Sequence, residues 1–226
     1  MKVISFVCQK GGTSKTTTAI NLAVEAMAYG LEVVLIDLDP QVSACDWKDI
    51  RGDAPPVVAA TPVPHLERGL KAAAENGADL VIIDTAGRTN DAAAAAARVA
   101  DLVFIPLQPS LVDLKTIGAT LEIIRLAGGK PTRAILSRVR AAGTRHEDSS
   151  AWLRTQGVEV CPFSLGERVT YQDAYANGLC VSEAEPEGKA ALEIRQVYLY
   201  ASSILGLPTQ RGQKHEENQR PRKRTA

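Results

Sequence analysis

A glycine-rich segment that joins an apolar run to a helix-like stretch is the feature that most constrains the fold of this chain. The run Val3–Cys8 leads directly into Gln9-Lys10-Gly11-Gly12-Thr13-Ser14-Lys15-Thr16-Thr17-Thr18. Glycines let consecutive backbone N–H groups curve around phosphate oxygens, and the N-terminus of a following helix adds partial positive charge. The sequence therefore predicts a strand–loop–helix unit that binds a phosphate.

The residue types in this loop indicate ATP and Mg²⁺ as its ligands. Lys15 is placed to reach the β- and γ-phosphates, and the hydroxyl of Thr16 is placed to ligate Mg²⁺. The first glycine of the general Walker A pattern is missing, and Lys10 stands directly before the glycine pair. The predicted nucleotide-binding residues of the loop are Lys10, Gly11, Gly12, Thr13, Ser14, Lys15, Thr16 and Thr17.

This loop resembles the KGGxGKT[TS] signature of the deviant Walker A ATPases, the family that includes ParA, MinD and nitrogenase iron-protein relatives. The resemblance implies that Lys10 reaches across a dimer interface to the partner's nucleotide, so both Lys10 and Lys15 are catalytic candidates. Ser14 stands where the family has glycine. Its side chain is expected either to crowd the phosphate and disfavour the backbone angles of the loop, or to donate a hydrogen bond to the phosphate.

A second set of polar residues follows the apolar stretch Glu32–Asp37, in the order Asp37-Leu38-Asp39-Pro40-Gln41-Val42-Ser43. Carboxylates at the carboxyl end of a strand project into the crevice where open α/β sheets bind ligands. The segment resembles the D-x-D-P-Q-x-S switch of ParA proteins. The resemblance implies that Asp37 helps to hold the Mg²⁺ hydration shell and that Asp39 orients or deprotonates the attacking water, with Asp39, Pro40 and Gln41 as switch residues.

A third motif, Leu80-Val81-Ile82-Ile83-Asp84-Thr85-Ala86-Gly87, has the Walker B pattern of four apolar residues that end in aspartate. It predicts that Asp84 lies near Mg²⁺ and that the N–H of Gly87 couples the γ-phosphate to a switch segment. Later in the chain, the resemblance implies an adenine pocket at Ser137, Arg138, Pro162 and Phe163. The stretch Gly166–Ser182 also resembles the C-terminal segment of ParA proteins, so the resemblance covers residues 1–206.

Apolar runs that alternate with helix-patterned stretches predict an α/β fold: a P-loop NTPase with a wound, mostly parallel β-sheet flanked by helices on both faces. We expect one ATPase domain over residues 1–207 and a basic, disordered tail over 208–226, and Asp53–Pro64 as an extended connection. The predicted strands are Val3–Cys8, Glu32–Asp37, Leu80–Asp84, Leu102–Leu107, Arg133–Val139 and Val158–Phe163. The predicted helices are Lys15–Tyr29, Leu66–Glu75, Asn90–Val99, Asp113–Leu126 with Asp113 as N-cap, and Asp148–Gln156.

Composition and spacing exclude several functions. The formal net charge is zero, so the whole-protein field does not select a partner. The four cysteines have no metal-site spacing, which argues against a nitrogenase-like cluster. No apolar segment approaches the ~20 residues that span a bilayer, and the terminal residues lack the apolar face of a membrane-binding helix. We expect a cytoplasmic, nucleoid-associated protein without a membrane partner.

The resemblance implies a molecular switch for plasmid or chromosome partitioning. Such a switch is an ATPase with weak intrinsic hydrolysis that dimerises on ATP, binds DNA non-specifically and is released when a centromere-binding ParB-like or ParG-like partner stimulates hydrolysis. Non-specific binding requires cationic contacts to phosphates. The candidates are Arg138, Arg140, Arg145 and Arg168 near the late strands, with Arg220, Arg222, Lys223 and Arg224 in the tail. Two alternatives stay open: a related ATPase that positions a protein cluster or organelle, and an ATP-dependent ligase similar to dethiobiotin synthetase.

Overall fold

A six-stranded parallel sheet forms the centre of the molecule. The computed structural model describes residues 1–87 and 89–212. The strands are β1 Lys2–Phe6, β2 Val33–Asp37, β3 Val57–Ala60, β4 Leu80–Asp84, β5 Leu102–Leu107 and β6 Thr132–Leu136. Their order across the sheet is β3-β2-β4-β1-β5-β6, and every recorded strand pair is parallel. The predicted α/β class and sheet type are confirmed.

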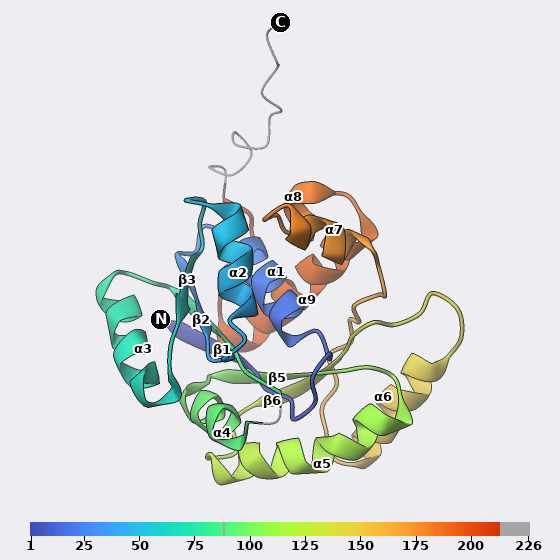
Figure 1. Cartoon of the computed structure of the whole chain (residues 1–226). Helices are drawn as coiled ribbons and strands as arrows, with labels where there is room; N and C mark the ends of the chain where they lie inside the picture. Colours follow the sequence, from blue (N-terminus) through green and yellow to red (C-terminus); the bar gives the residue numbers. More distant parts are fainter. Residues whose placement is uncertain (88, 213–226) are drawn as a thin grey trace, which may run out of the picture.

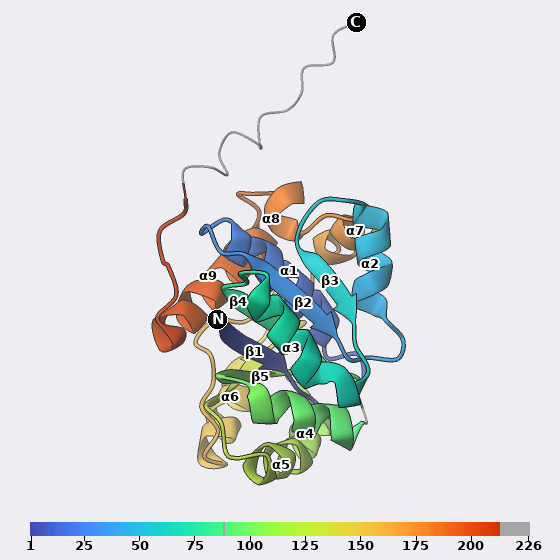
Figure 2. The same ribbon diagram turned by 90° about the vertical axis from the view of Figure 1, so that its left-hand side faces the viewer.

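Helices cover both faces of the sheet, as Figures 1 and 2 show. One face carries α1 Lys15–Met27, α2 Ser43–Arg51, α7 Thr170–Ala176, α8 Val181–Ala184 and α9 Lys189–Leu205. The other carries α3 Leu66–Glu75, α4 Asn90–Val99, α5 Leu111–Leu126 and α6 Arg145–Thr155, with a 3₁₀ turn at Val63–His65 before α3. Each face has its own apolar core. The central strands are buried on both sides, which is why they are continuously apolar in sequence.

Two predicted segments differ in the structure. The expected strand Val158–Phe163 is wrong, because it makes only an isolated bridge between Val160 and Ala134, and Pro162 lacks the N–H that would extend the ladder. The expected connection Asp53–Pro64 contains the edge strand β3. An edge strand needs only one hydrogen-bonded neighbour, so the prolines on either side of Val57–Ala60 do not prevent pairing with β2.

All five predicted helices are present, and three of them, α1, α5 and α6, have shifted ends. Leu66–Glu75 and Asn90–Val99 have the predicted bounds, whereas Asp113 is not the N-cap of α5. That cap is Ser110, whose hydroxyl accepts a hydrogen bond from the Asp113 N–H at 3.3 Å. Helices α2, α7, α8 and α9 are not among the predicted helices.

The strand register brings the three phosphate-related motifs to one edge of the sheet. β4 lies between β2 and β1, and Asp84 pairs in register with Asp37 on one side and with Phe6 on the other. The glycine-rich loop leaves β1 just after Phe6, so it lies next to both carboxylates. The carboxyl edge of β2, β4 and β1 is therefore the place for a ligand.

The first residues of the segment predicted as a tail pack on the domain. The Gly212 N–H donates to the Ala28 carbonyl at 3.1 Å, and the Tyr198 hydroxyl donates to the Pro208 carbonyl at 2.9 Å. Residues 213–226, with the predicted DNA-contact residues Arg220, Arg222, Lys223 and Arg224, lie outside the described residues. Within the described part of the chain, none of the helices has the length and apolar character needed to cross a membrane.

Candidate nucleotide-binding site

The glycine-rich loop is held open by hydrogen bonds to its carbonyl groups. The side-chain amide of Gln108 donates to the Gly12 carbonyl at 2.9 Å, and the buried hydroxyl of Ser137 donates to the Thr13 carbonyl at 3.0 Å. With these carbonyls engaged from outside, the N–H groups of the loop remain for an anion. Ser137, predicted as an adenine contact, thus supports the loop.

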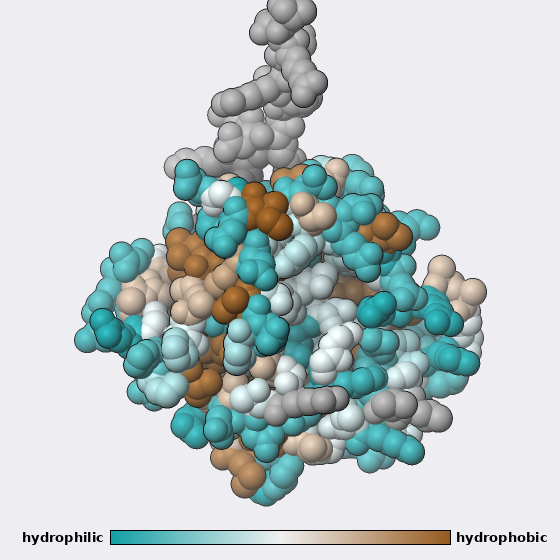
Figure 3. All heavy atoms as spheres, viewed as in Figure 1, coloured by the Kyte–Doolittle hydropathy of each residue, from teal (hydrophilic) through white to brown (hydrophobic). Residues whose placement is uncertain are grey.

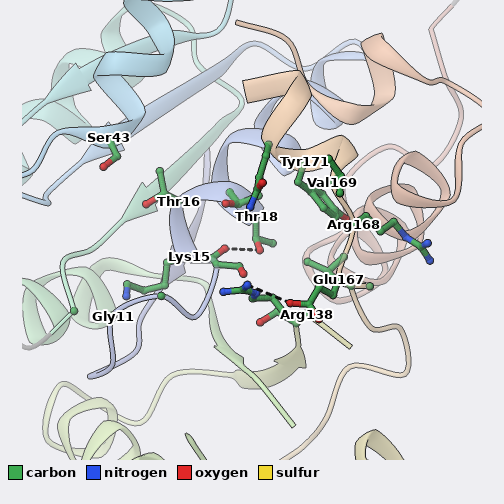
Figure 4. A pocket seen from close by; sticks show the side chains of 18 of the residues that line it. Gly11, Lys15, Thr16, Thr18, Ser43, Arg138, Glu167, Arg168, Val169 and Tyr171 are labelled. Atoms are coloured by element: carbon green, nitrogen blue, oxygen red, sulfur yellow. Dashed lines mark hydrogen bonds and ion pairs between the residues drawn. The ribbon is translucent and has the colours of Figure 1, made fainter. Parts of the chain in front are cut away.

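A cavity of about 600 Å³ opens beside the loop. Figure 4 shows the loop residues Gly11, Lys15 and Thr16 on one side of it and Arg138, Glu167 and Tyr171 on the other. The lining contains most of the predicted site: Gly11, Gly12, Ser14, Lys15, Thr16, Thr17, Asp39, Gln41, Gly87, Ser137 and Arg138. Lys15 is 6% exposed, and its ammonium group donates to the Lys10 carbonyl at 3.1 Å.

Thr16, which lines the cavity, and the buried carboxylates of Asp84 and Asp37 at the ends of β4 and β2 fit a magnesium ion. The Thr16 hydroxyl lies 2.5 Å from Oδ2 of Asp84, and Oδ1 of Asp84 is buried without a hydrogen-bond partner among the described residues. Burial raises the pKa of Asp84 to about 7, although the Thr16 hydroxyl and the charge of Lys15 act in the opposite direction. Burial also raises the pKa of Asp37, although both of its oxygens accept backbone N–H groups, from Asp39 and Ala44. A hydroxyl and two carboxylates are oxygen ligands of the kind that Mg²⁺ prefers.

The switch segment forms a tight turn between β2 and α2. The Asp39 carboxylate accepts the Gln41 N–H at 2.9 Å, and the Asp39 carbonyl accepts the Val42 N–H at 2.8 Å. Val42 has φ +46°, a left-handed conformation that a β-branched residue rarely adopts. Asp39, Gln41 and Ser43 line the cavity, while Pro40 is an exposed turn residue beside them. The predicted switch and the loop therefore face the same ligand space.

Lys10 points away from this cavity. Its ammonium group forms an ion pair with Asp113 at the start of α5, whose carboxylate is completely buried. Asp113 also accepts the Gln108 N–H and the Ser110 hydroxyl, each at 3.0 Å. The side chain of Lys10 is 33% exposed, so this first lysine of the loop is reachable from outside and does not contact the phosphate space of its own chain.

One wall of the cavity is formed by residues that the sequence did not predict as nucleotide contacts. The segment Leu165–Val169 and the first residues of α7, Tyr171 and Gln172, line it opposite the loop. The Tyr171 hydroxyl is buried without a partner among the described residues, and burial raises its pKa. The available signal was the similarity of Gly166–Ser182 to a ParA segment, which did not indicate a role. Among the described residues, Pro162 and Phe163 are not part of the lining; Phe163 packs against the core.

The arginines predicted to contact DNA are partly paired with acids. Arg138 lies 3.2 Å and Arg140 3.7 Å from the Glu167 carboxylate, and Arg168 pairs with Glu193. Arg138 has φ +52°. A second cavity of about 360 Å³ adjoins the first, and its lining includes Arg138, Arg140, Arg145 and His146. The Arg140 side chain is 81% exposed and Arg145 is also exposed, so both can reach a polyanion.

The parallel sheet, the glycine-rich loop on β1 and the carboxylates at the ends of β2 and β4 together define a P-loop ATPase. Residues 4–181 match the family described as the CobQ/CobB/MinD/ParA nucleotide binding domain. The chain therefore belongs to the MinD/ParA family of P-loop ATPases and uses ATP with Mg²⁺.

Relatives agree with this membership, and solved structures share the fold. The chain is 33% identical over 202 residues to "Maintenance of carboxysome distribution protein A" of Gloeobacter kilaueensis, covering 87% of this chain and 90% of the relative. It is 30% identical over 216 residues to "Protein ParA" of Rhizobium radiobacter, covering 91% and 96%. Its fold resembles the ATP complex of a Cyanothece McdA variant with a TM-score of 0.70 at 19% identity, covering 94% and 99%. The Aquifex aeolicus MinC:MinD complex matches with 0.73 at 15% identity, covering 90% and 96%.

Ser14 departs from the family pattern at a position with a left-handed backbone. Its φ and ψ are 69° and 25°, the region in which a residue with a Cβ is strained by about 1–2 kcal/mol. We predict that Ser14→Gly raises the free energy of unfolding by about 1 kcal/mol, since the relief of strain exceeds the added entropy of the unfolded chain. For a domain of this size, the midpoint of nucleotide-free thermal unfolding should rise by about 2–4 °C.

The control is Ser164→Gly, because Ser164 does not have a positive φ and glycine there only adds freedom to the unfolded state. It should lower the midpoint. If Ser14→Gly also lowered the midpoint, Ser14 would be stabilising the loop through its hydroxyl.

Proposed function

We propose that this protein is an ATP-operated switch that segregates DNA, dimerising on ATP and binding DNA non-specifically until a partner protein stimulates hydrolysis. The single observation that carries the proposal is the position of Lys10. A lysine in the phosphate-binding loop that points out of its own cavity and is 33% exposed suits a second subunit's nucleotide. Dimerisation then requires Lys10 to leave Asp113, so the phosphates of the partner's nucleotide take the place of the Asp113 carboxylate as the anion that Lys10 contacts.

The residues of the cavity support hydrolysis by positioning. Lys15 and the loop N–H groups would hold the phosphates, and Thr16, Asp37 and Asp84 would hold Mg²⁺ directly or through water. The ion would neutralise charge on the phosphates. Asp39, on the switch turn that lines the same cavity, would orient the attacking water. The N–H of Gly87 would report the presence of the γ-phosphate to the segment that follows it.

The face of the molecule in Figure 3 supports an association that depends on charge and nucleotide. It is mostly hydrophilic or intermediate, and its hydrophobic residues form small separate patches. Arg140 and Arg145 beside the second cavity would add phosphate contacts, which a dimer doubles. A dimer would therefore bind DNA much more tightly than a monomer.

Lys10→Ala tests the proposal. With Mg²⁺ and a non-hydrolysable ATP analogue, we expect the wild type to sediment as a dimer and to be retained on DNA, whereas with ADP it stays monomeric and unbound. Lys10→Ala should remain monomeric and unbound with either nucleotide, because no cation completes the partner's site. The control is Lys71→Ala on α3, which removes an exposed lysine whose side chain is 78% accessible. Dimerisation of Lys10→Ala at wild-type concentrations, or DNA retention that ignores the nucleotide, would refute the switch.

The positioning of a protein cluster is a second candidate function. The observation that favours it is the 33% identity to a carboxysome distribution protein over 90% of that protein's length. ATP-dependent dimerisation and DNA binding would serve either cargo, so the identity of the partner protein distinguishes the two functions. A neighbouring gene for a ParB-like or ParG-like DNA-binding protein supports partition, and a neighbour that coats a protein assembly supports positioning. ATP hydrolysis without any small acid acceptor would count against a ligase.

A further inference from the structure

The short helices α7 and α8 connect the far wall of the nucleotide cavity to the switch helix α2. The Tyr175 hydroxyl on α7 donates to the carbonyl of Ser43, the first residue of α2, at 2.7 Å. The indole N–H of Trp47 on α2 donates to the Leu179 carbonyl in the turn between α7 and α8 at 3.2 Å. Trp47 is fully buried, so this contact has no competition from water.

A partly buried ion pair fixes the other end of α2 to α8. Arg51 forms two parallel bonds with the Glu183 carboxylate, at 2.8 and 2.7 Å, and donates to the Gly178 carbonyl at 2.9 Å. Its side chain is 6% exposed, and its guanidinium lies 4.9 Å from the centre of the Trp47 ring. A Cβ on Gly178 would lie 2.7 Å from the backbone of Arg51, so the two segments are as close as glycine permits.

Helix α8 also contacts α1, the helix that follows the phosphate loop. Val181, at the start of α8, donates its N–H to the side chain of Asn21 on α1 at 2.9 Å, and α1 begins at the loop residue Lys15. The cavity is lined by Leu165–Val169, which lead into α7, and by Tyr171 and Gln172 on α7 itself. Residues 170–184 therefore contact α1, α2 and the far wall of the cavity at once.

The location of Ser43 makes the contact with Tyr175 relevant to hydrolysis. Ser43 lines the cavity together with Asp39, four residues earlier in the chain. Only the turn Asp39–Val42 separates them, and Val42 holds a left-handed φ of +46° that leaves the turn little freedom. A displacement of the first residue of α2 must therefore move Asp39.

We propose that Tyr175 is a positioning residue for ATP hydrolysis: through Ser43 it holds the first turn of α2, and with it Asp39, in line with the bound nucleotide. Helices α7 and α8 form a brace: they connect the far wall of the cavity to α2, so a nucleotide that contacts this wall also affects the position of the switch segment. The inference rests on the proposed role of Asp39 in orienting water.

The first test is Tyr175→Phe, which removes one hydrogen bond and keeps the packing of the ring. Loss of one hydrogen bond that holds a reacting group in place should lower kcat by about five-fold, whereas the Kd of a non-hydrolysable ATP analogue stays within about two-fold of wild type. The matched control is Tyr200→Phe on α9, which removes a hydroxyl that accepts a hydrogen bond from Arg133 at 2.9 Å far from the cavity. It should leave kcat unchanged. Hydrolysis rates are normalised to the concentration of bound nucleotide, so a merely unfolded fraction does not alter kcat.

The second test uses tryptophan fluorescence, since the chain has two tryptophans, Trp47 and Trp152. Trp152 lies on α6 and is 38% exposed. In a Trp152→Phe background, emission from Trp47 alone should differ between ADP and the ATP analogue, and Tyr175→Phe should abolish most of that difference. The control with Tyr200→Phe should retain it.

The outcomes separate the inference from the proposed function. If Asp39→Ala hydrolyses ATP at the wild-type rate, the role of Asp39 fails and the inference fails with it. If Asp39→Ala is inactive but Tyr175→Phe keeps its kcat, or Trp47 emission ignores the nucleotide, the brace alone is refuted. A five-fold loss in kcat at unchanged nucleotide affinity, with a Trp47 signal that depends on Tyr175, supports the inference.

Discussion

Gly87→Ala is expected to lower the affinity for ATP by roughly 10- to 100-fold, because a Cβ has no space at this position. It would lie 2.8 Å from the Gly11 nitrogen and 3.0 Å from both the Gly11 Cα and the Lys10 carbonyl carbon. All three neighbours are backbone atoms, so no flexible side chain can move aside. The phosphate loop itself must shift, and its N–H groups lose the alignment that an anion requires.

Calorimetric titration with ADP and with a non-hydrolysable ATP analogue measures this effect. The matched control is Gly118→Ala on α5, where a Cβ meets no atom within 4 Å. It should leave nucleotide affinity unchanged and raise the free energy of unfolding by about 0.5–1 kcal/mol, since alanine favours a helix interior. Wild-type affinity in Gly87→Ala would show that the contact between the two segments opens before the nucleotide binds.

The contact between Gly87 and the loop illustrates which parts of the site the sequence alone could predict. The loop, Asp37 and Asp84 follow local patterns, and the parallel order of the strands brings them together at one edge. Their roles follow from residue type and from position at a strand end. The close approach of Gly87 to Gly11 is a tertiary contact between distant parts of the chain, and no local sequence pattern predicts it.

The parts that could not be predicted depend on partners far apart in the chain. Lys10 and Asp113 are separated by 103 residues, and Asp113 has a sequence context that suggests a helix cap. The cavity wall at Leu165–Val169 has no strand or helix signal, because it is held by single bonds to β6 and α9, such as the Gly166 N–H to Glu193 at 2.9 Å. Strand β3 was missed because the prolines before it favour a connection, and because an edge position tolerates them.

Residues 208–212, the described start of the segment predicted as a tail, contact the core of the domain. The charge of this segment and its lack of apolar residues predict a disordered tail, yet Arg211 donates to Oε1 of Glu25 at 2.6 Å. Glu25 lies on α1 and is fully buried, with Arg195 at 3.6 Å as its second cation. The buried Glu25 carboxylate thus has as a counter-ion Arg211, a residue of the segment that is poor in apolar residues.

Arg211→Ala is expected to lower the free energy of unfolding by about 2–3 kcal/mol, because it leaves the buried Glu25 carboxylate with Arg195, at 3.6 Å, in place of the closer Arg211. The loss is below that of a fully buried pair, since the Arg211 side chain is 35% exposed and Arg195 remains. Arg211 also stacks on Tyr29, with its guanidinium 5.8 Å from the ring centre, and that contact is lost too. The midpoint of thermal unfolding should fall by roughly 5–10 °C for a domain of this size.

The double variant Glu25→Gln/Arg211→Ala separates charge from packing. A neutral amide does not need a counter-ion, so the double variant should recover at least half of the decrease in unfolding midpoint that Arg211→Ala causes. If the decrease came from lost packing alone, the single and double variants would be equally unstable. The control is Arg125→Ala, which breaks an exposed pair with Glu122 in which the two side chains are 67% and 53% accessible, and should leave the midpoint unchanged. An unchanged midpoint in Arg211→Ala would mean that Arg195 compensates Glu25 unaided, and that residues 208–212 contribute little to the stability of the domain.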